Sequence, residues 1–334
     1  MRQKYKYSTE ILPDVFCITL PLPGRKPGPV NVYLFKGDND ISLIDTGTKQ
    51  TAGILKKALK EHGLAFSDIN QIIITHGHGD HFGAAKMIAR GGSAHVIVHA
   101  EDRALIEKGH DILTKKYKQF LKLMNIPRSV GMMLRLLFVF FKRMADNCNI
   151  HHVIQEGDEI TIGRYRAKII ETPGHSKGSI CVYLEKDKIL FCGDTIIQHI
   201  TPNAFIMMDE KEILPVRLSQ NEFYKSLARI KELAPLMIHS AHGKAISGVD
   251  EIVAGYEKAF AERKENVLSF VHSGENNVYR IARLLFPEIG GLKLPLEIFL
   301  SISEVYTTIQ ILQKEKKVSL VIRNGLLEVH ETVQ

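Results

Sequence analysis

Short apolar runs rich in β-branched residues alternate with turns and helical spacing over the first hundred residues. Two segments, 51–63 and 82–92, carry apolar residues at helical spacing, and Gly63 is placed to cap the first of them. The runs that predict strands are 15–23, 30–35, 38–47, 68–75 and 94–100. This order of strands and helices predicts a layered α/β domain with its chemistry at the strand ends.

The strand pattern stops at residue 101 and resumes after residue 149. The interval contains no convincing strand but several amphipathic helical stretches, which Pro127 splits. After it, a helix is predicted at 221–234, and the predicted strands are 167–174, 179–187, 188–195 and 236–243. We therefore predict one domain of residues 1–250 with a helical insertion at about 101–149.

A different pattern begins near Asp250. Residues 251–272, 277–287 and 295–317 have helical spacing, and 318–331 reads as a hairpin that turns at Asn324-Gly325. Three helices followed by a hairpin predict a second, winged-helix-like domain of residues 251–334.

Composition places the chain among ordinary globular proteins, with 45% hydrophobic and 24% charged residues in 334. The net charge is +7, and the largest basic excess lies in residues 101–150. The N-terminal MRQKYKYSTE lacks the apolar region of a signal peptide. The most apolar stretch, 132–141, is interrupted by Arg135 and is far shorter than the roughly 20 residues that cross a bilayer. We therefore expect a cytoplasmic protein without an integral membrane segment.

Four scattered cysteines, with no CxxC pair, agree with reduced thiols: Cys17, Cys148, Cys181 and Cys192.

The heptapeptide THGHGDH at 75–81 concentrates coordinating side chains directly after the apolar run 72–74. Three further segments, TPGHSKGS, FCGDT and SAHGK, each follow a predicted strand, which brings all four segments to one edge. The seven candidate ligands are His76, His78, Asp80, His81, His175, Asp194 and His242. Seven nitrogen and oxygen ligands without sulfur are too many for one tetrahedral zinc ion. They suit two metal ions about 3.5–4 Å apart, bridged by a carboxylate and a hydroxide.

These motifs, with IDTG at 44–47, resemble those of the metallo-β-lactamase superfamily over roughly residues 10–250. The resemblance implies an αββα sandwich with the metals at one edge. It implies that three residues hold the first metal: His76, His78 and His175. It implies that three hold the second: Asp80, His81 and His242. Asp194 would bridge both metals, and Asp45 would orient a ligand without binding metal.

Asp194 also indicates a subgroup within that superfamily. True β-lactamases of this fold generally lack a bridging carboxylate, whereas glyoxalase II, lactonases and ribonuclease-Z-like members carry one. The resemblance thus implies a binuclear hydrolase in which a metal-bridging hydroxide attacks a small ester, thioester or lactone. Asp80 would bind metal and also orient the nucleophile. Zinc is the expected metal, and the ligand types leave iron and manganese open.

The insertion leaves three interpretations open. It forms a lid for an apolar, anionic small-molecule substrate, it packs on the sandwich, or it forms the surface of a homodimer. Binding to a membrane surface is a further, less favoured interpretation.

The C-terminal segment resembles the small winged-helix domain of lactamase-beta-like endoribonucleases through AERKENVLSFV, NVYRIARLLFP and VIRNGLLEVH. A metal-dependent ribonuclease or phosphodiesterase is therefore the alternative function. The helix at 296–314 carries Glu297 and Glu304 where a nucleic-acid reader has a basic face, so RNA is the less favoured partner. A third alternative is an iron-dependent sulfur oxygenase or a non-catalytic ligand-binding relic, although every ligand position is filled by a ligating residue type.

Overall fold

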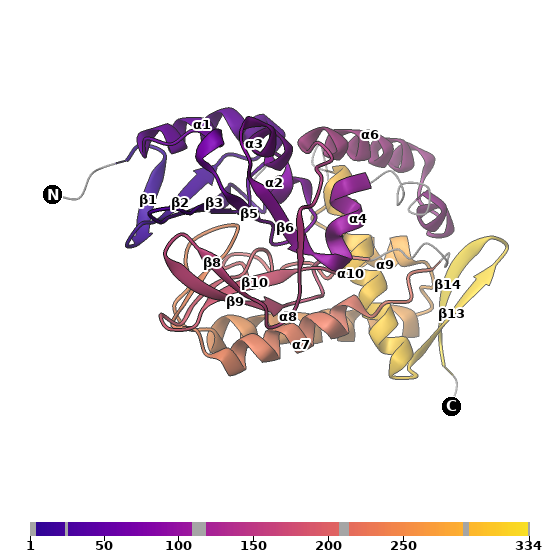
Figure 1. Cartoon of the computed structure of the whole chain (residues 1–334). Helices are drawn as coiled ribbons and strands as arrows, with labels where there is room; N and C mark the ends of the chain where they lie inside the picture. Colours follow the sequence, from indigo (N-terminus) through magenta and orange to yellow (C-terminus); the bar gives the residue numbers. More distant parts are fainter. Residues whose placement is uncertain (1–4, 24–25, 109–117, 207–213, 290–293, 333–334) are drawn as a thin grey trace. The chain divides into compact units, whose positions relative to one another are not determined.

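The computed structural model describes residues 5–23, 26–108, 118–206, 214–289 and 294–332 (Figure 1). The chain divides into two compact units. Unit 1 comprises Met1–Gly109, Phe141–Pro202 and Ser226–Asp250, and unit 2 comprises His110–Phe140, Asn203–Lys225 and Glu251–Gln334. The domain division at residue 250 stays a prediction, and the fold is described below by unit.

The first sheet of unit 1 has seven strands in the order of the sequence (Figure 1). Neighbours are antiparallel from β1 to β4 and parallel from β4 to β7. The strands are β1 (Ser8–Leu12), β2 (Val15–Leu20), β3 (Val30–Lys36), β4 (Ile41–Ile44), β5 (Gln71–Ile73), β6 (His95–His99) and β7 (His152–Ile154).

The second sheet of unit 1 has five strands in the order β12-β11-β10-β9-β8. β11 and β12 are parallel, and the other neighbours are antiparallel. The strands are β8 (Glu159–Ile162), β9 (Tyr165–Glu171), β10 (Ile180–Leu184), β11 (Ile189–Phe191) and β12 (Met237–His239).

Helices cover the outer faces of both sheets. Figure 1 shows α1 (Ala52–Glu61) and α3 (Ala85–Gly91) over the first sheet, and α7 (Ser219–Leu233) over the second. The α7 side chain of Ser226 donates a hydrogen bond to the Pro173 carbonyl at 2.7 Å. Shorter helices of unit 1 are η1 (Lys49–Thr51), η2 (Phe66–Asp68), α2 (Gly79–Phe82) and α4 (Ala100–Lys108).

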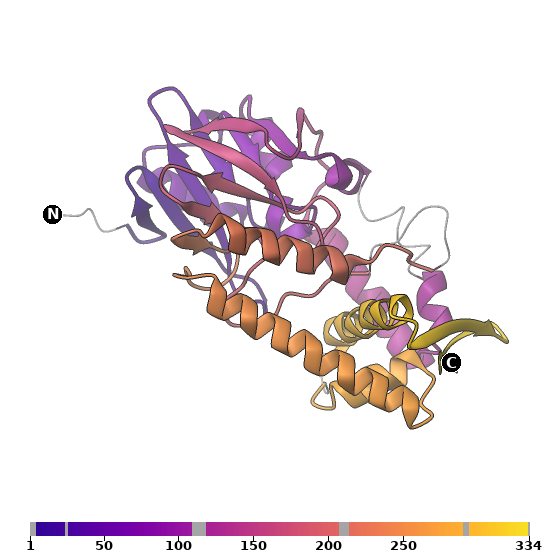
Figure 2. The ribbon, with the colours of Figure 1, turned by 90° about the horizontal axis from the view of Figure 1, so that it is seen from below.

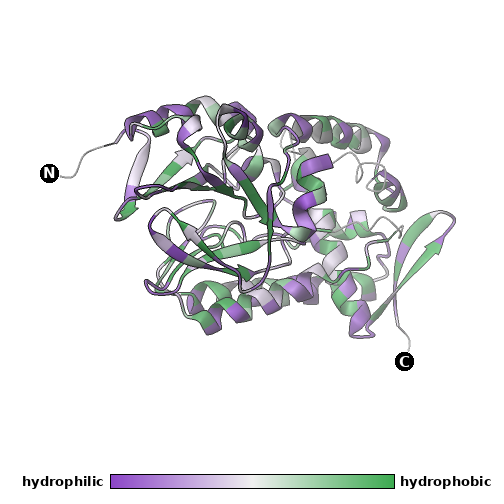
Figure 3. Cartoon of the chain, viewed as in Figure 1, coloured by the Kyte–Doolittle hydropathy of each residue, from purple (hydrophilic) through white to green (hydrophobic). Residues whose placement is uncertain are grey.

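Adjacent residues of the central strands enter two different cores. Leu43 and Ile72 pack with Leu55 of α1, in the core between the first sheet and its helices. Their neighbours Ile44 and Ile73 enter the core between the two sheets. Because successive side chains of a strand point to opposite faces, a sheet buried on both sides needs continuous apolar runs (Figure 3). This arrangement confirms the predicted αββα sandwich.

Unit 2 is mainly helical and ends in a two-stranded antiparallel hairpin (Figure 2). Residues 118–123 are also helical, and α6 and α7 have residues in both units. The elements are α6 (Arg128–Met144), α8 (Asp250–His272), α9 (Val278–Leu285), α10 (Leu294–Lys314), β13 (Val318–Arg323) and β14 (Leu326–Glu331). Three helices and a hairpin therefore follow residue 249, and the winged-helix resemblance stays a prediction.

Residues 301–312 of helix α10 are buried within unit 2, including their polar side chains. Tyr306 Oη and Gln310 Nε2 both donate to the Pro215 carbonyl, at 3.1 and 2.6 Å. Glu304 accepts a hydrogen bond from Arg263 at 3.0 Å, and burial raises the pKa of Glu304 although Arg263 opposes the shift. These side chains are committed to contacts inside the unit, so α10 does not present them to a nucleic acid.

The insertion is helical where the structure describes it, with the predicted break at Pro127 between 118–123 and α6. Residues 109–117 of the insertion lie outside the described part, and its role as a lid stays a prediction.

Three strands were not predicted from the sequence: β1, β7 and β8. No helix in the described residues is long and apolar enough to cross a membrane.

Candidate metal centre

All seven predicted ligands lie at strand ends of unit 1. His76 and His78 follow β5, and Asp80 and His81 lie in α2. The other three follow β9, β11 and β12 in turn: His175, Asp194 and His242. The seven side chains form three overlapping groups, and the ligand atoms within each group lie within 4.8 Å of one another.

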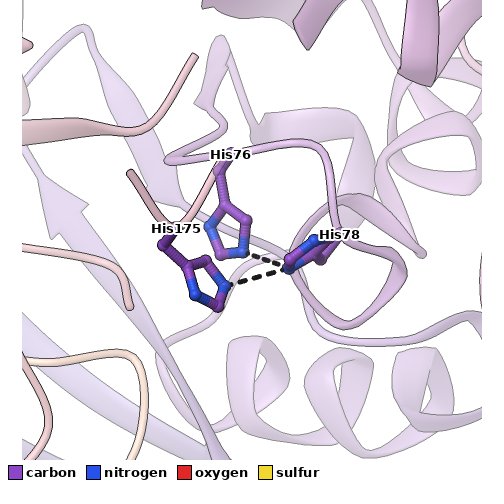
Figure 4. A group of neighbouring side chains, drawn as sticks. All are labelled: His76, His78 and His175. Carbon is purple, nitrogen blue, oxygen red and sulfur yellow. Dashed lines mark hydrogen bonds between the residues drawn. The ribbon is translucent and has the colours of Figure 1, made fainter. Parts of the chain in front are cut away.

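Three histidines form the first group, called the triad here: His76, His78 and His175 (Figure 4). Their rings come from two loops and point toward one another. His78 Nδ1 lies 2.9 Å from His76 Nε2 and 3.1 Å from His175 Nε2. Two imidazole nitrogens bound to one tetrahedral zinc ion lie roughly 3.3 Å apart, so the triad is close to the spacing that a metal requires.

A second group, the acidic cluster, lies beside the triad and contains Asp80, His81 and His242. The Nε2 atoms of His81 and His242 lie 3.7 and 3.6 Å from the two oxygens of Asp80. The side chains of both histidines have no solvent exposure, whereas that of Asp80 is 18% exposed. Asp80 is therefore the member of the acidic cluster that solvent reaches.

Asp194 lies between the two groups. Its Oδ2 is 3.5 Å from His175 Nε2 of the triad and 3.7 Å from His81 Nε2 of the acidic cluster. Its Oδ1 is 3.4 Å from His242 Nε2. A single buried carboxylate thus faces nitrogens of both groups.

Three buried polar atoms at this place have no hydrogen-bond partner: His81 Nε2, His242 Nε2 and Asp194 Oδ1. Leaving such atoms unsatisfied in a protein interior costs about 1–3 kcal/mol each. Their clustering is therefore unfavourable unless a cation is bound there. Together with the nitrogen and oxygen donor set, it shows that these side chains fit divalent metal ions.

The opposite ring nitrogens of the acidic-cluster histidines are fixed by hydrogen bonds. His81 Nδ1 lies 2.8 Å from Asp45 Oδ2, and His242 Nδ1 lies 3.0 Å from the Pro29 carbonyl oxygen. Both oxygens accept, so Nδ1 of each ring carries a proton, and Nε2 is the nitrogen directed toward the group. Asp45 also accepts hydrogen bonds from the backbone N–H and the hydroxyl of Thr75, each at 2.8 Å. The sequence did not single out Thr75 or Pro29, because a backbone carbonyl and a lone threonine carry no motif.

The triad favours neutral imidazoles. Burial, and then the neighbouring His81 and His78, lower the pKa of His76 well below its usual value. Burial and the neighbouring His175 lower the pKa of His78 to about 3. Neutral imidazole is the form that binds metal, so these residues are ready to bind near neutral pH.

The acidic cluster has the opposite electrostatics. Burial alone would lower the pKa of His81, but Asp80, Asp45 and Asp194 together raise it well above its usual value. Burial would likewise raise the pKa of Asp194, yet His242 and His81 hold it well below its usual range. The acidic cluster is therefore an arrangement of opposite charges when no metal is bound.

The comparisons with known proteins agree with this geometry. The family model described as the metallo-beta-lactamase superfamily matches residues 25–247, which is more than half of the chain. The chain belongs to the metallo-beta-lactamase superfamily. It is a metallo-hydrolase of this superfamily, as its named relatives indicate.

Two curated relatives and one solved structure show how far the likeness extends. The chain is 27% identical to the probable metallo-hydrolase YqjP of Bacillus subtilis over 317 residues, covering 92% of this chain and 94% of that protein. It is 28% identical over 174 residues to the acyl-coenzyme A thioesterase MBLAC2 of Bos taurus, covering 50% of this chain and 58% of that one. A metallo-beta-lactamase family protein from Thermus thermophilus has a TM-score of 0.79 at 22% identity, over 96% of this chain and 100% of that chain. This last likeness shows the fold.

The structure brings together every residue that the sequence nominated, and the assignment of each as a metal ligand stays a prediction. Asp45 lies where the superfamily resemblance puts an orienting residue. His239, which precedes His242 and was given no role, stacks on Phe191 with ring centroids 5.2 Å apart. Burial lowers its pKa to about 4, which agrees with a neutral packing residue.

Proposed function

We propose that this chain is a binuclear hydrolase of small carboxylic esters, thioesters or lactones, and that zinc is its metal. The position of Asp194 carries the proposal, because its two oxygens face nitrogens of both the triad and the acidic cluster. A carboxylate whose two oxygens face both groups could bind two ions close to one reacting centre. In this proposal the triad holds one ion, the acidic cluster holds the other, and Asp194 binds both.

The chemistry follows from what the ions supply and what the side chains do. Two bound divalent ions lower the pKa of a water molecule toward about 7 and polarise the carbonyl under attack. The neutral histidines of the triad donate nitrogen lone pairs without first losing a proton. Asp194 keeps its negative charge in this site because the neighbouring histidines lower its pKa. The chain thus supplies anionic and neutral donors that hold divalent cations at neutral pH.

Asp80 has a second role in the proposed reaction. One of its oxygens would bind metal, and the other would accept a hydrogen bond from the attacking water. Its 18% exposed side chain is the most accessible of the acidic cluster, whereas His81 and His242 are fully enclosed. It is thus placed on the side from which water and substrate arrive, and it orients the nucleophile during the attack.

The thioester class is the first to examine. The similarity to a protein named as an acyl-coenzyme A thioesterase supports it, as does the basic excess of the insertion, which suits an anionic substrate. The burial of α10 inside unit 2 speaks against the ribonuclease alternative, since that helix would have been the nucleic-acid reader.

The test is a parallel measurement of turnover on an acyl-coenzyme A thioester, a simple ester, a lactone and single-stranded RNA. It uses protein loaded with zinc and the same protein after chelation. Metal-dependent hydrolysis of a thioester, ester or lactone, lost in Asp194→Asn, is the expected result. Salt-sensitive RNA cleavage without ester, thioester or lactone turnover would replace the proposal with the ribonuclease alternative.

A further inference from the structure

A buried carboxylate from α4 lies between the two loops that carry the triad. Asp102 is 3% exposed and forms no ion pair with a described residue. A buried carboxylate without a cationic partner is costly unless several donors satisfy its oxygens. The identity of those donors therefore indicates what the residue does.

Three hydrogen bonds satisfy the Asp102 carboxylate. Its Oδ2 accepts the backbone N–H of Gly77 and the hydroxyl of Ser176, each at 2.8 Å. Its Oδ1 accepts the backbone N–H of Gly178 at 3.0 Å. Hydrogen bonds to an ionised acceptor are roughly twice as strong as those between neutral groups. The carboxylate therefore ties the 75–81 loop firmly to the 172–179 loop.

These donors are next in the chain to all three histidines of the triad. Gly77 lies between His76 and His78, and Ser176 directly follows His175. The first loop follows β5 of the seven-stranded sheet, whereas the second connects β9 to β10 of the five-stranded sheet. The loops belong to different sheets, and one backbone hydrogen bond joins their bases, from the Ile180 N–H to the Thr75 carbonyl at 3.0 Å. The contacts of Asp102 lie farther along the loops, next to the histidines themselves.

The close approach of the 172–179 loop to α4 requires glycine at position 178, and the 75–81 loop approaches a side chain of the same helix. A Cβ at Gly178 would lie 2.8 Å from Asp102 Cγ and 2.9 Å from its backbone nitrogen. A Cβ at Gly77 would lie 2.8 Å from Leu105 Cδ2 on the same helix. The Leu105 side chain could turn away from a Cβ at position 77, whereas the backbone nitrogen of Asp102 could not move away from one at position 178. The 172–179 loop is therefore shaped to let its N–H group reach the carboxylate.

The hydroxyl of Ser176 is also held in the direction of Asp102. Ser179 Oγ accepts the backbone N–H of Ser176 at 3.1 Å and lies 2.8 Å from Ser176 Oγ. The Ser179 hydroxyl can therefore donate to Ser176 Oγ, which leaves the Ser176 proton for Asp102. This chain of hydrogen bonds fixes the loop that carries His175.

We propose that Asp102 is a positioning residue that sets the spacing of the triad, by holding the loops of His76–His78 and His175 at one separation. The inference rests on the proposed function, because it concerns the geometry of a metal site. It adds a residue outside the seven ligands and Asp45, on a helix that the sequence motifs do not include.

The test uses Asp102→Asn, which keeps the size of the side chain but replaces one acceptor by an N–H donor. That donor would face either the Gly178 N–H or the Gly77 N–H, so one tie between a loop and α4 is lost in either orientation. Cobalt(II) is the probe, because its absorption spectrum reports the ligand geometry. Binding is measured in the His242→Ala background, where the triad would be the remaining intact site, and in the His78→Ala background, where the acidic cluster would remain.

We expect Asp102→Asn to weaken cobalt binding roughly 10–100-fold and to change the cobalt spectrum in the His242→Ala background. We expect little change in the His78→Ala background. The matched control is Glu101→Gln, an exposed carboxylate in the same helical turn, which should leave both affinities unchanged. A purely structural role would lower the melting temperature without separating the two backgrounds.

A second variant keeps the test decisive if Asp102→Asn does not fold. Ser176→Ala removes one of the three hydrogen bonds and should weaken cobalt binding in the same background by a smaller factor. Unchanged affinity and spectrum in Asp102→Asn, or in Ser176→Ala when the first variant is not soluble, would overturn the inference. If the unmutated protein binds no cobalt, the proposed function itself fails, and this outcome is distinct from a variant that binds like the wild type.

Discussion

The triad and the acidic cluster lie side by side in one centre, yet they are built on different physical principles. In the triad, burial and mutual repulsion keep His76 and His78 neutral, and the pKa of His78 falls to about 3. In the acidic cluster, three nearby carboxylates outweigh burial and raise the pKa of His81. His76 and His78 of the triad therefore present nitrogen lone pairs that can bind an ion directly. In the acidic cluster, a histidine proton must leave before that nitrogen can bind an ion.

The two groups also differ in the contacts that hold their histidines in place. The triad is held by loop-to-helix contacts at Asp102, while the acidic-cluster histidines are held by hydrogen bonds from their own rings to Asp45 and Pro29. Asp194 is the element common to both. The variants below separate these roles, in order of expected effect.

The largest loss is expected from Asp194→Ala. Removing the carboxylate that faces both groups leaves His242 without its main opposite charge, takes one of three nearby carboxylates from His81, and removes the proposed bridge. Loss of a residue that only orients a ligand costs up to roughly 100-fold in activity. We expect the hydrolysis rate of Asp194→Ala to fall by more than this, and the variant to lose metal. Kinetics and metal content of the purified variant check this. Full turnover in Asp194→Ala would contradict the paired site.

Variants that each lack one ligand should show whether the two metal sites are separate. His78→Ala is expected to lose the ion of the triad, and His242→Ala the ion of the acidic cluster, so that each variant holds about half of the wild-type metal. Elemental analysis of both variants after the same purification gives the answer. If both variants lose all metal, the two sites are not separable and the comparison fails.

A smaller effect is expected from Asp45→Asn. The amide can place its N–H toward His81 Nδ1, which then favours the wrong tautomer of the ring. We expect metal affinity of the acidic cluster to fall roughly 10–100-fold while that of the triad stays the same. Asp187→Asn, in an exposed turn, is the control. Equal weakening at both sites would show that Asp45 acts on the whole fold.

The smallest expected effect is a difference between the two groups in the protons released on metal binding. The raised pKa of His81 means that it holds a proton at pH 7 when no metal is bound, and binding must release this proton. The lowered pKa values of His76 and His78 mean that no proton leaves them. The pKa of His242 is also raised, because Asp194 and Asp80 outweigh burial. Affinity at the acidic cluster should therefore rise with pH by up to about tenfold per unit for each of these two histidines, below their pKa values, whereas His76 and His78 should add little pH dependence at the triad. Calorimetry in buffers of different ionisation enthalpy counts the protons, and equal release at both sites would refute the distinction.

The sequence predicted the ligand-bearing loops because each follows an apolar strand run and carries a coordinating side chain. The order of strands and helices predicted a layered α/β domain, and the superfamily resemblance implied the αββα sandwich, in which Leu43 and Ile44 enter different cores. Strands β7 and β8 were missed because three- and four-residue strands with exposed positions have no distinctive periodicity. Asp102 was missed because its partners are backbone N–H groups of distant glycines, and such contacts leave no spacing pattern in the chain.

The most direct test of the account is the metal content per chain, with the identity of the metal, in wild-type protein purified without chelator. The account predicts two equivalents of a divalent metal, with zinc expected, and one equivalent in His242→Ala. One equivalent in the wild type, or none after reconstitution, would contradict the proposal that the triad and the acidic cluster form one binuclear centre.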